Sequence, residues 1–289
     1  MAAVLALASA FLYALKSVLQ QKAAATAPQK HSLRPGLLVH LASRPLWLAG
    51  TAADGLAFVL HFLALRVGSL VLVQPLLVTS LLFALPLGTA FSGMALTRTH
   101  WLGASAVVVG LVVFLLAASP EEGDAYTSGA RWLVVGIGTA ILVGAIVGLA
   151  PKQPGAARAA ALAVAAGLSY AVIAGLLKAT SEALEGGLGA ALTSWEPYAL
   201  AVSGALGLLL GQSAFQAGPL GASLPLLIAL DPVASIALGA LAFGEELATA
   251  PVAVVVEVAA LAVVVAGIFT LARSEASMLA PAPPPTGPS

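Results

Sequence analysis

The sequence contains no cysteine and very little charge. The absence of cysteine among its 289 residues excludes disulfides, iron–sulfur clusters and thiolate metal sites. Charged residues make up only 8% of the chain, whereas 60% of its residues are hydrophobic and the mean hydropathy is +1.04. A soluble domain carries about 25% charged residues. A chain this apolar would have no polar surface to present to water, so the composition predicts an integral membrane protein.

Other absences exclude whole classes of function. Twelve Lys and Arg residues balance twelve Asp and Glu residues, and there is no basic cluster, so nucleic acid is not an expected partner. No phosphate-binding loop of the Walker type occurs, so ATP is not the expected energy source. His-Glu-x-x-His and Gly-x-Ser-x-Gly are also missing. We therefore expect a protein that is not an enzyme and that needs no cofactor.

One block of the sequence occurs twice. The segment from Gly68 to Pro75 (GSLVLVQP) is echoed by the segment from Gly218 to Pro225 (GPLGASLP). Each copy continues as a long apolar stretch that ends in GMAL (93–96) or GEEL (244–247), and a second apolar stretch follows. A duplicated block of membrane-length segments is typical of secondary transporters, which hold substrate between their two halves near mid-membrane.

The apolar segments are long enough to be membrane-spanning helices. A bilayer core of about 30 Å requires about 20 apolar residues in a helix. Strand alternation is absent, so we predict an all-α polytopic bundle of nine helices. A tenth would need 35–43 or 182–196, which are only partly apolar and could be short or re-entrant. The nine segments are 3–21, 45–66, 69–92, 100–118, 130–150, 156–179, 197–217, 219–243 and 251–272.

These segments divide the chain into four parts. Residues 1–118 form the first transmembrane repeat, 119–154 a joining helix with its loops, and 155–273 the second repeat. Residues 274–289 are rich in proline and are expected to be a disordered tail. Because one additional helix, which belongs to neither copy, connects them, the second copy would cross the membrane in the opposite direction to the first. The sequence thus predicts two inverted repeats.

Positive charge predicts the orientation of the chain. In a nine-helix topology eight basic residues fall on one side of the membrane and two fall on the other, which identifies the richer side as cytoplasmic. We therefore expect a multi-pass protein of the cell membrane, embedded in its lipid bilayer, with a cytoplasmic C-terminus and an external N-terminus. The eight are Lys22, Lys30, Arg34, Arg44, Arg98, Lys152, Arg158 and Arg273; the two are Arg66 and Arg131.

Two carboxylates lie deep in the apolar segments. A charged side chain at mid-membrane costs roughly 2.5–3.5 kcal/mol on insertion scales, so each one requires a reason. Asp231 lies near the centre of 219–243, and Asp54 lies well inside 45–66. Asp231 precedes Pro232, so it could cap a restarted half-helix or form a cation or proton site where the helix bends. Asp54 and Asp231 are also the candidate metal ligands.

Further polar residues share helix faces with these carboxylates. Asp54 and His61 are seven apart on one face, either as a self-satisfied buried pair or as a proton relay or cation-binding edge. Tyr13, Lys16 and Gln20 form a polar stripe on the first helix, where Lys16 could neutralise Asp54 or Asp231.

Amides and prolines complete the candidate set. Gln212 and Gln216 lie four apart on one helix, and Gln74 precedes Pro75. These amides could line a polar path or lock helices together. Pro75, Pro225 and Pro232 are expected to break their helices. The candidate cavity-lining residues are Tyr13, Lys16, Gln20, Asp54, His61, Gln74, Gln212, Gln216 and Asp231.

These motifs resemble a known superfamily. The second copy, with GQSAFQAG (211–218), SLP (223–225), DP (231–232) and FGE (243–245), resembles the drug/metabolite transporter superfamily. The first copy, with HFLALRVG (61–68) and QP (74–75), is similar to it. The pattern looks like the EamA-type repeat, and the nine-helix count is closest to the NIPA-like magnesium transporters. The first copy departs from the pattern because Ser92-Gly93-Met94 lacks the Glu of Gly244-Glu245.

The resemblance implies a secondary transporter that works by alternating access, but it does not fix the cargo. The superfamily carries sugars, amino acids, drugs, nucleotide sugars and, in the NIPA-like branch, Mg²⁺. Asp54 and Asp231 could supply oxygen ligands for Mg²⁺ or another divalent cation, although Lys16 beside them would repel a dication. An apolar cavity with a few amides and one ion pair suits a small organic solute or drug equally well.

A third hypothesis is a membrane scaffold that transports nothing. It predicts that Asp231→Asn and His61→Ala leave the phenotype intact while substitutions at Gly-x-x-x-Gly spacings do not. A homodimer is left open as an assembly.

Overall fold

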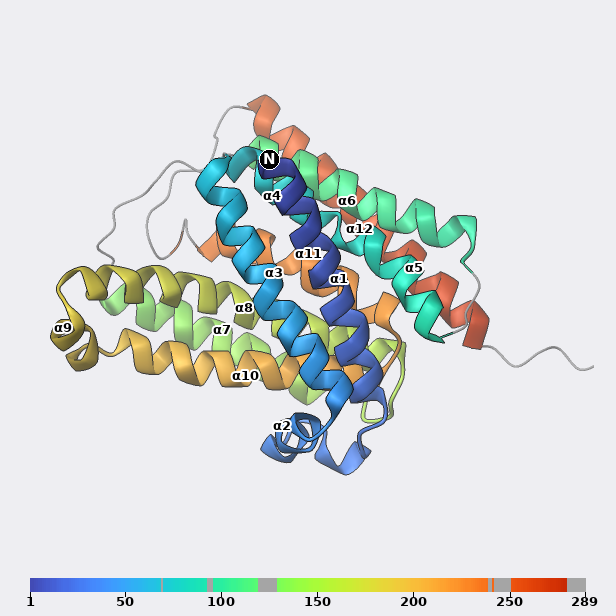
Figure 1. Cartoon of the computed structure of the whole chain (residues 1–289), viewed down its shortest axis with the longest axis horizontal. Helices are drawn as coiled ribbons and strands as arrows, with labels where there is room; N and C mark the ends of the chain where they lie inside the picture. Colours follow the sequence, from blue (N-terminus) through green and yellow to red (C-terminus); the bar gives the residue numbers. More distant parts are fainter. Residues whose placement is uncertain (69, 93–95, 119–128, 239–240, 242–250, 280–289) are drawn as a thin grey trace, which may run out of the picture.

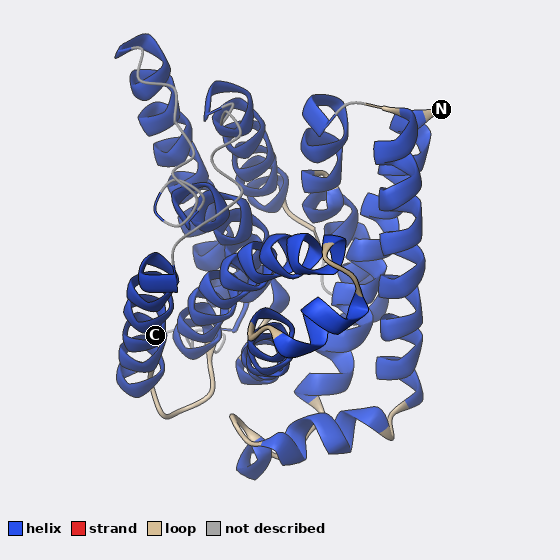
Figure 2. Cartoon of the chain, turned by 90° about the vertical axis from the view of Figure 1, so that its left-hand side faces the viewer, coloured by secondary structure: helices blue, strands red, loops and turns tan. Residues whose placement is uncertain are grey.

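The chain folds as a bundle of helices. The computed structural model describes residues 1–68, 70–92, 96–118, 129–238, 241 and 251–279. Within these ranges every regular element is a helix, and no strand occurs (Figure 2). Among the described residues, eight helices are long and apolar enough to cross a membrane. The protein is therefore a multi-pass membrane protein of the all-α class, as the composition predicted.

Each expected segment coincides with a helix or a pair of helices in the described ranges. α7 is not one of the eight candidate spans, because its apolar stretch, Val134–Leu149, is shorter than theirs. The helices are α1 (Ala2–Ala25), α3 (Pro45–Val67), α4 (Leu70–Val78) with α5 (Ser80–Ser92), α6 (Arg98–Ala118), α7 (Gly129–Leu149), α8 (Ala156–Glu185), α10 (Glu196–Ala217), α11 (Leu220–Leu238) and α12 (Pro251–Leu279).

The two segments considered for a tenth span are short helices. Residues 35–43 contain α2 (Pro35–Ala42), which follows the 3₁₀ turn η1 (Gln29–His31), and residues 182–196 contain α9 (Leu188–Thr193). Neither approaches the length of about 20 residues that a bilayer core requires. α9 connects α8 to α10 in Figure 1, and α2 connects α1 to α3.

The three helix-breaking prolines behave differently. α4 ends one turn after Pro75, where the Thr79 N–H bonds to the Leu76 carbonyl oxygen at 3.2 Å before α5 begins. α11 instead runs without interruption through Pro225 and Pro232, where the sequence predicted breaks. A proline removes one backbone donor and strains the helix, but tight packing on both sides can hold the helix together. Pro225 is fully buried in this packing.

The proline-rich tail begins later than the sequence predicted. α12 continues past Arg273 to Leu279, whereas disorder was expected from residue 274. Residues such as Glu275, Ala276, Met278 and Leu279 sustain a helix, and only the prolines from Pro281 onward oppose it. Residues 280–289 lie outside the described part of the chain, as do the GMAL and GEEL ends of the repeats, apart from Leu96.

The bundle is built from four close helix pairings. α1 packs along α3 and against α4 and α5, while α8 packs along α10 and α11. α6 and α12 lie side by side over their length (Figure 1). One buried apolar cluster joins α1, α5, α6, α11 and α12, and a second joins α1, α2, α8, α10 and α11.

Glycines allow α6 and α12 to approach closely. A Cβ placed on Gly110 of α6 would lie 2.8 Å from the carbonyl oxygen of Ala260 of α12, and one on Gly267 of α12 would lie 2.7 Å from the carbonyl oxygen of Gly103. Real Cβ atoms do not tolerate such contacts with backbone. Without a hydrophobic drive between helices in lipid, close backbone packing of this kind holds a membrane bundle together.

Gly110→Ala is accordingly expected to destabilise the protein by about 1–3 kcal/mol, the usual cost of overpacking a close interface. The measurement is the thermal unfolding midpoint in detergent. Gly138→Ala in α7 is the matched control, because nothing lies within 4 Å of a Cβ placed there. If both variants unfolded at the wild-type temperature, the α6–α12 contact would not be as close as described.

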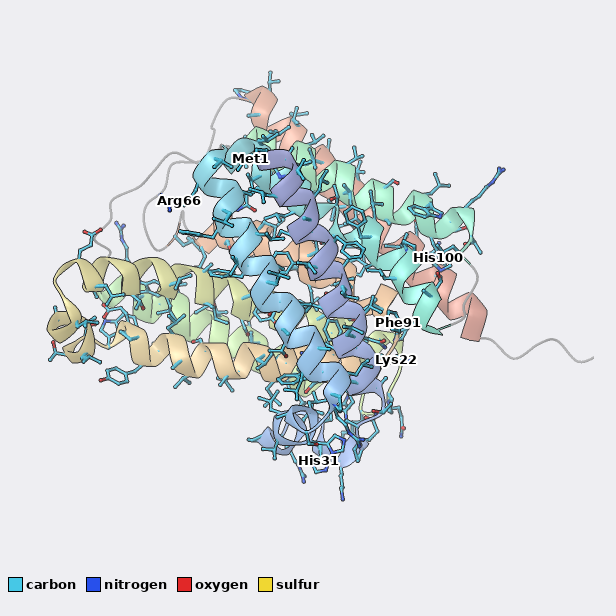
Figure 3. The ribbon with its side chains drawn as sticks, viewed as in Figure 1. Met1, Lys22, His31, Arg66, Phe91 and His100 are labelled. Carbon is cyan, nitrogen blue, oxygen red and sulfur yellow. The ribbon has the colours of Figure 1, made fainter. Side chains whose placement is uncertain are left out.

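The helix ends form two opposite faces of the bundle. The Lys22 ammonium donates to the Phe91 carbonyl at 3.0 Å, which joins the ends of α1 and α5. The Gly155 N–H donates to the Ala217 carbonyl at 2.7 Å, which joins the start of α8 to the end of α10. We call this the basic end; it also holds η1 and the start of α6 (Figure 3). Met1 and the C-terminal end of α3 lie at the opposite end.

Candidate functional site

An ion pair lies between α1 and α3. The Lys16 ammonium is 2.8 Å from the Asp54 carboxylate, so Asp54 is one of the two partners that the sequence allowed for Lys16. Both residues stand near the middle of their helices, and their side chains are 29% and 37% exposed in the bundle. Charged groups at such depth are tolerated only when they face protein or water and not lipid. The pair therefore marks a polar interior on this side of α1.

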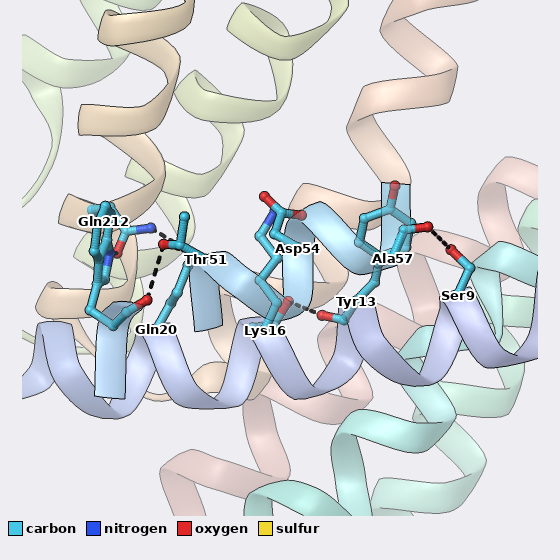
Figure 4. A network of polar contacts seen from close by, with 10 residues as sticks. Ser9, Tyr13, Lys16, Gln20, Thr51, Asp54, Ala57 and Gln212 are labelled. Atoms are coloured by element: carbon cyan, nitrogen blue, oxygen red, sulfur yellow. Dashed lines mark hydrogen bonds and ion pairs between the residues drawn. The ribbon is translucent and has the colours of Figure 1, made fainter. Parts of the chain in front are cut away.

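Two aromatic rings extend the polar stripe of α1. The Tyr13 ring packs edge-on against the His61 ring of α3 with their centroids 6.4 Å apart. The Lys16 nitrogen lies 5.9 Å from the centre of the Tyr13 ring, within reach of a cation–π interaction. The His61 Nε2 atom is buried and has no hydrogen-bond partner among the described residues. Figure 4 shows Tyr13, Lys16 and Asp54 gathered between α1 and α3.

The second carboxylate approaches the pair from α11. Asp231 is partly buried, bonds to the Ser235 side chain one turn further along, and interacts electrostatically with Lys16. Because α11 is continuous here, Asp231 does not cap a restarted half-helix. Its second sequence interpretation, a cation or proton site, stays a prediction.

Tyr170 of α8 completes the group and was not singled out in the sequence. It interacts electrostatically with both Asp231 and Asp54. A signal was present, since Tyr170 precedes alanine in the first helix of the second copy, as Tyr13 does in the first helix of the first copy. The central cluster consists of Tyr13, Lys16, Asp54, His61, Tyr170 and Asp231.

A glycine face of α10 makes room for Tyr170. A Cβ on Gly211 would lie 2.5 Å from the Tyr170 hydroxyl oxygen, and one on Gly207 would lie 3.1 Å from the ring. The Gly-x-x-x-Gly spacing of 207 and 211 thus accommodates an aromatic side chain at the central cluster. These glycines therefore position a polar group as well as bringing helices together.

Gly211→Ala is expected to displace the Tyr170 hydroxyl and to destabilise the protein by about 1–3 kcal/mol, because the new methyl group occupies the position against which that hydroxyl packs. Gly204→Ala on the same helix should leave the stability unchanged, since nothing lies within 4 Å of a Cβ there. The thermal unfolding midpoints of the two variants in detergent provide the measurement. Equal midpoints would contradict the close packing of Tyr170 on α10.

The glutamines lie outside the central cluster. The side-chain Nε2 of Gln212 donates to the side-chain Oε1 of Gln20 at 2.9 Å (Figure 4). The side-chain Oε1 of Gln212 accepts from the Trp47 indole N–H at 3.1 Å. The Gln20 amide donates to the Thr51 hydroxyl at 3.4 Å. We call these four side chains, together with Gln216, the amide network. Of the two roles that the sequence left open, these contacts favour locking helices together.

Gln74 stands apart from both groups. It is partly buried on α4 beside Pro75, and its side chain makes no hydrogen bond to any described residue. The predicted site residues therefore separate into the central cluster, the amide network and Gln74.

The comparisons with known proteins identify a family but no activity. No family profile matches the chain, and no solved structure matches it. The chain is similar to an uncharacterized protein of Corynebacterium glutamicum, with 32% identity over 248 residues. The match covers 85% of this chain and 86% of the corynebacterial protein. The chain belongs to the family of that protein. The function of this family member has to be argued from its own residues.

Asp54 and Asp231, the candidate metal ligands, both lie within the described ranges of this family member. No group of three or more His, Asp or Glu side chains there could hold a metal ion. The Asp54 carboxylate is occupied by the Lys16 ammonium at 2.8 Å, which places a positive charge where a cation would bind. Mg²⁺ is usually held by one or two carboxylates with retained waters. Of these two carboxylates, only Asp54 forms an ion pair within the described ranges.

Proposed function

We propose that this protein is a secondary transporter of the drug/metabolite type that works by alternating access. The observation that carries the proposal is the central cluster. The cluster contains one ammonium, two carboxylates and an imidazole, which belong to helices of both sequence copies and lie well inside those helices. Intramembrane ionisable groups that face one another are costly, and transport pathways are where they are retained.

The helix order supports two inverted repeats within nine membrane helices. In the first copy α1 packs on α3 and on the α4–α5 pair, and in the second copy α8 packs on α10 and α11 in the same way. α1 ends at the basic end, where the Gln21 amide contacts the Gly218 carbonyl, whereas α8 begins there. α6 likewise begins there, and α12 ends there, with Ser274 Oγ 3.2 Å from His100 Nε2. Corresponding helices thus run in opposite senses, as in many transporters.

The basic end faces the cytoplasm in this proposal. It gathers Lys22, Arg44 and Arg158 with the other basic residues of the richer side. An excess of Lys and Arg on short loops sets the orientation of membrane proteins. The N-terminus would then lie outside the cell membrane and the C-terminus inside.

A small organic solute fits the central cluster better than Mg²⁺ does. Because Lys16 and Asp54 compensate each other, the cluster offers a neutral pair, one further carboxylate, two tyrosine hydroxyls and a buried imidazole nitrogen that has no hydrogen-bond partner among the described residues. Polar groups of this kind can orient a solute that carries hydrogen-bonding groups. Asp231 is the group that we propose exchanges a proton, which would couple solute movement to the proton gradient.

A ligand-stabilisation screen tests this proposal. The purified protein would be heated in detergent with small organic solutes and, as a separate arm, with Mg²⁺. We expect to find a solute that raises the unfolding midpoint of the wild type. Lys16→Met should need at least a tenfold higher concentration of that solute for the same rise. Stabilisation by Mg²⁺ alone that is lost in Asp231→Asn would replace the organic solute with a divalent cation. No stabilising ligand in either arm would favour the scaffold hypothesis.

A further inference from the structure

We infer that the amide network is the gate at the basic end of the transporter and that it is shut in this structure. The inference rests on the proposed function, because a gate has meaning only where a cargo passes. It assigns a separate role to Gln20, Trp47, Thr51, Gln212 and Gln216, which lie outside the central cluster.

Hydrogen bonds join the two copies directly at this level. Gln212 of α10 donates to Gln20 of α1 at 2.9 Å and accepts from Trp47 of α3 at 3.1 Å. Gln212 is 2% exposed and Gln20 is 3% exposed, so water does not reach these amides in the present state. Each bond crosses from the first copy to the second, so the copies cannot separate here unless the network opens.

A second layer of bonds connects Gln216 of the network, and Ser213 beside it, to η1 and the adjoining chain. The Gln216 amide donates to the carbonyls of Ala27 at 3.1 Å and Pro28 at 2.9 Å. The Leu33 N–H donates to the Ser213 hydroxyl at 3.1 Å. The segment between α1 and α2 is thereby held across the end of α10. This segment acts as a strap that closes the basic end.

The Arg158 guanidinium ties the same strap to α8. It donates to the Ser32 hydroxyl at 3.2 Å and to the Lys152 carbonyl at 2.7 Å. Leu37 and Leu41 of α2 are fully buried against α8 and α10 in one shared apolar cluster. Polar and apolar contacts therefore seal the copies together at the same end.

The opposite end is organised differently. There one apolar cluster, around Ala6, Ala64 and Val73, consists only of first-copy helices. Another, around Trp132, Ala171 and Leu238, consists of α7 and second-copy helices. The cross-copy hydrogen bonds described above, from Gln21–Gly218 to Gln212–Gln20, lie at the basic end. α8 and α10 cross the α1–α3 pair near that end and extend away from it toward α9 (Figure 1).

Neutral amides are suited to a contact that must break and re-form. When the network opens, water can replace each protein hydrogen bond, so the amides stay satisfied in both states. An ion pair would bind the copies together and leave charges to be solvated on opening. α6 and α12 remain packed along their length and provide an axis about which the remaining helices can move.

Thiol labelling tests the gate without knowledge of the cargo. Because the chain has no cysteine, Ser235→Cys introduces a single thiol beside Asp231. A membrane-impermeant maleimide would be applied from each side of sealed vesicles. Ser43→Cys, exposed at the basic end, identifies which side that end faces. We expect the thiol at position 235 to react at least tenfold faster from the opposite side than from the basic side.

Opening the network should abolish this preference. Gln212→Ala removes the bonds to Gln20 and Trp47, and we expect it to raise labelling from the basic side at least tenfold. Leu206→Ala, on the lipid-exposed face of the same helix, should leave labelling unchanged. Trp47→Phe keeps the aromatic ring and removes only the N–H donor, so it serves if Gln212→Ala does not fold. For Trp47→Phe we expect a smaller rise, about threefold, in the labelling of position 235 from the basic side.

The outcomes separate the gate from the proposed function. Equal labelling of position 235 from both sides in the wild type would overturn the inference. So would basic-side labelling that neither Gln212→Ala nor Trp47→Phe changes. Because the readout requires no cargo, failure of every candidate cargo in flux assays would count against the proposed function and not against the labelling result.

Discussion

Asp231→Asn is expected to abolish the acceleration of uptake by an imposed pH gradient and to keep at least a tenth of the wild-type exchange of solute for solute. Asparagine has the size and hydrogen-bonding capacity of aspartate, but it neither binds nor releases a proton. Exchange at equal pH requires only that the loaded transporter change its orientation. Net uptake driven by protons requires the carboxylate itself.

The reason for this expectation is the position of Asp231. It lies in the middle of α11 with Ser235 as its hydrogen-bonding neighbour, and no ion pair involves it among the described residues. A carboxylate at mid-membrane costs roughly 2.5–3.5 kcal/mol in its charged form on insertion scales, so protonation is an available way to lower that cost. Ser235→Ala is the control and should retain gradient-driven uptake. Gradient-driven uptake by Asp231→Asn at the wild-type rate would remove Asp231 from the coupling mechanism.

Lys16→Met is expected to lower stability and to stop transport, whereas the double variant Lys16→Met/Asp54→Leu should recover stability alone. Removing one partner of a buried ion pair costs about 3–5 kcal/mol because the other charge remains uncompensated. Exposed pairs contribute about 0–1 kcal/mol. With side chains 29% and 37% exposed, this pair lies between these limits. We expect a loss of about 2 kcal/mol for the single variant.

Thermal unfolding in detergent and uptake into proteoliposomes together distinguish structural from functional roles of the pair. The double variant carries no unpaired charge, so its unfolding midpoint should return to within a few degrees of the wild type. Its uptake should stay at the level of empty liposomes, because the ammonium and carboxylate that orient the solute are both gone. A double variant that transports normally would make the ion pair purely structural.

The sequence predicts the helices well because length and hydropathy determine them. A membrane span needs an uninterrupted apolar run, and all of the expected segments contain helices. The polar stripe of α1 was also predictable, since Tyr13, Lys16 and Gln20 recur at helical spacing. The residues that contact this stripe on α3 and α10 could not be predicted. Which residues meet there depends on how the three helices cross, and the spacing of residues along one helix does not determine that crossing.

Local rules were insufficient at the prolines and at the end of α12. Pro75 is followed by a break and Pro225 and Pro232 are not, although the residue type is the same. The difference lies in the neighbouring helices, which can restrain a strained turn in a buried helix. The helical residues 274–279 likewise depend on a contact made through folding, since Ser274 lies against His100 of α6. Tyr170 was missed because its role depends on a glycine face of α10.

Uptake into proteoliposomes tests the central claim most directly, using the solute that stabilises the purified protein most strongly. Radiolabelled solute would be added to vesicles holding the wild type, Lys16→Met or no protein, with Mg²⁺ entry followed separately by an internal dye. The account predicts saturable uptake of the organic solute by the wild type and none above empty vesicles for Lys16→Met. Folded wild-type protein that moves neither the solute nor Mg²⁺ above empty vesicles would contradict it.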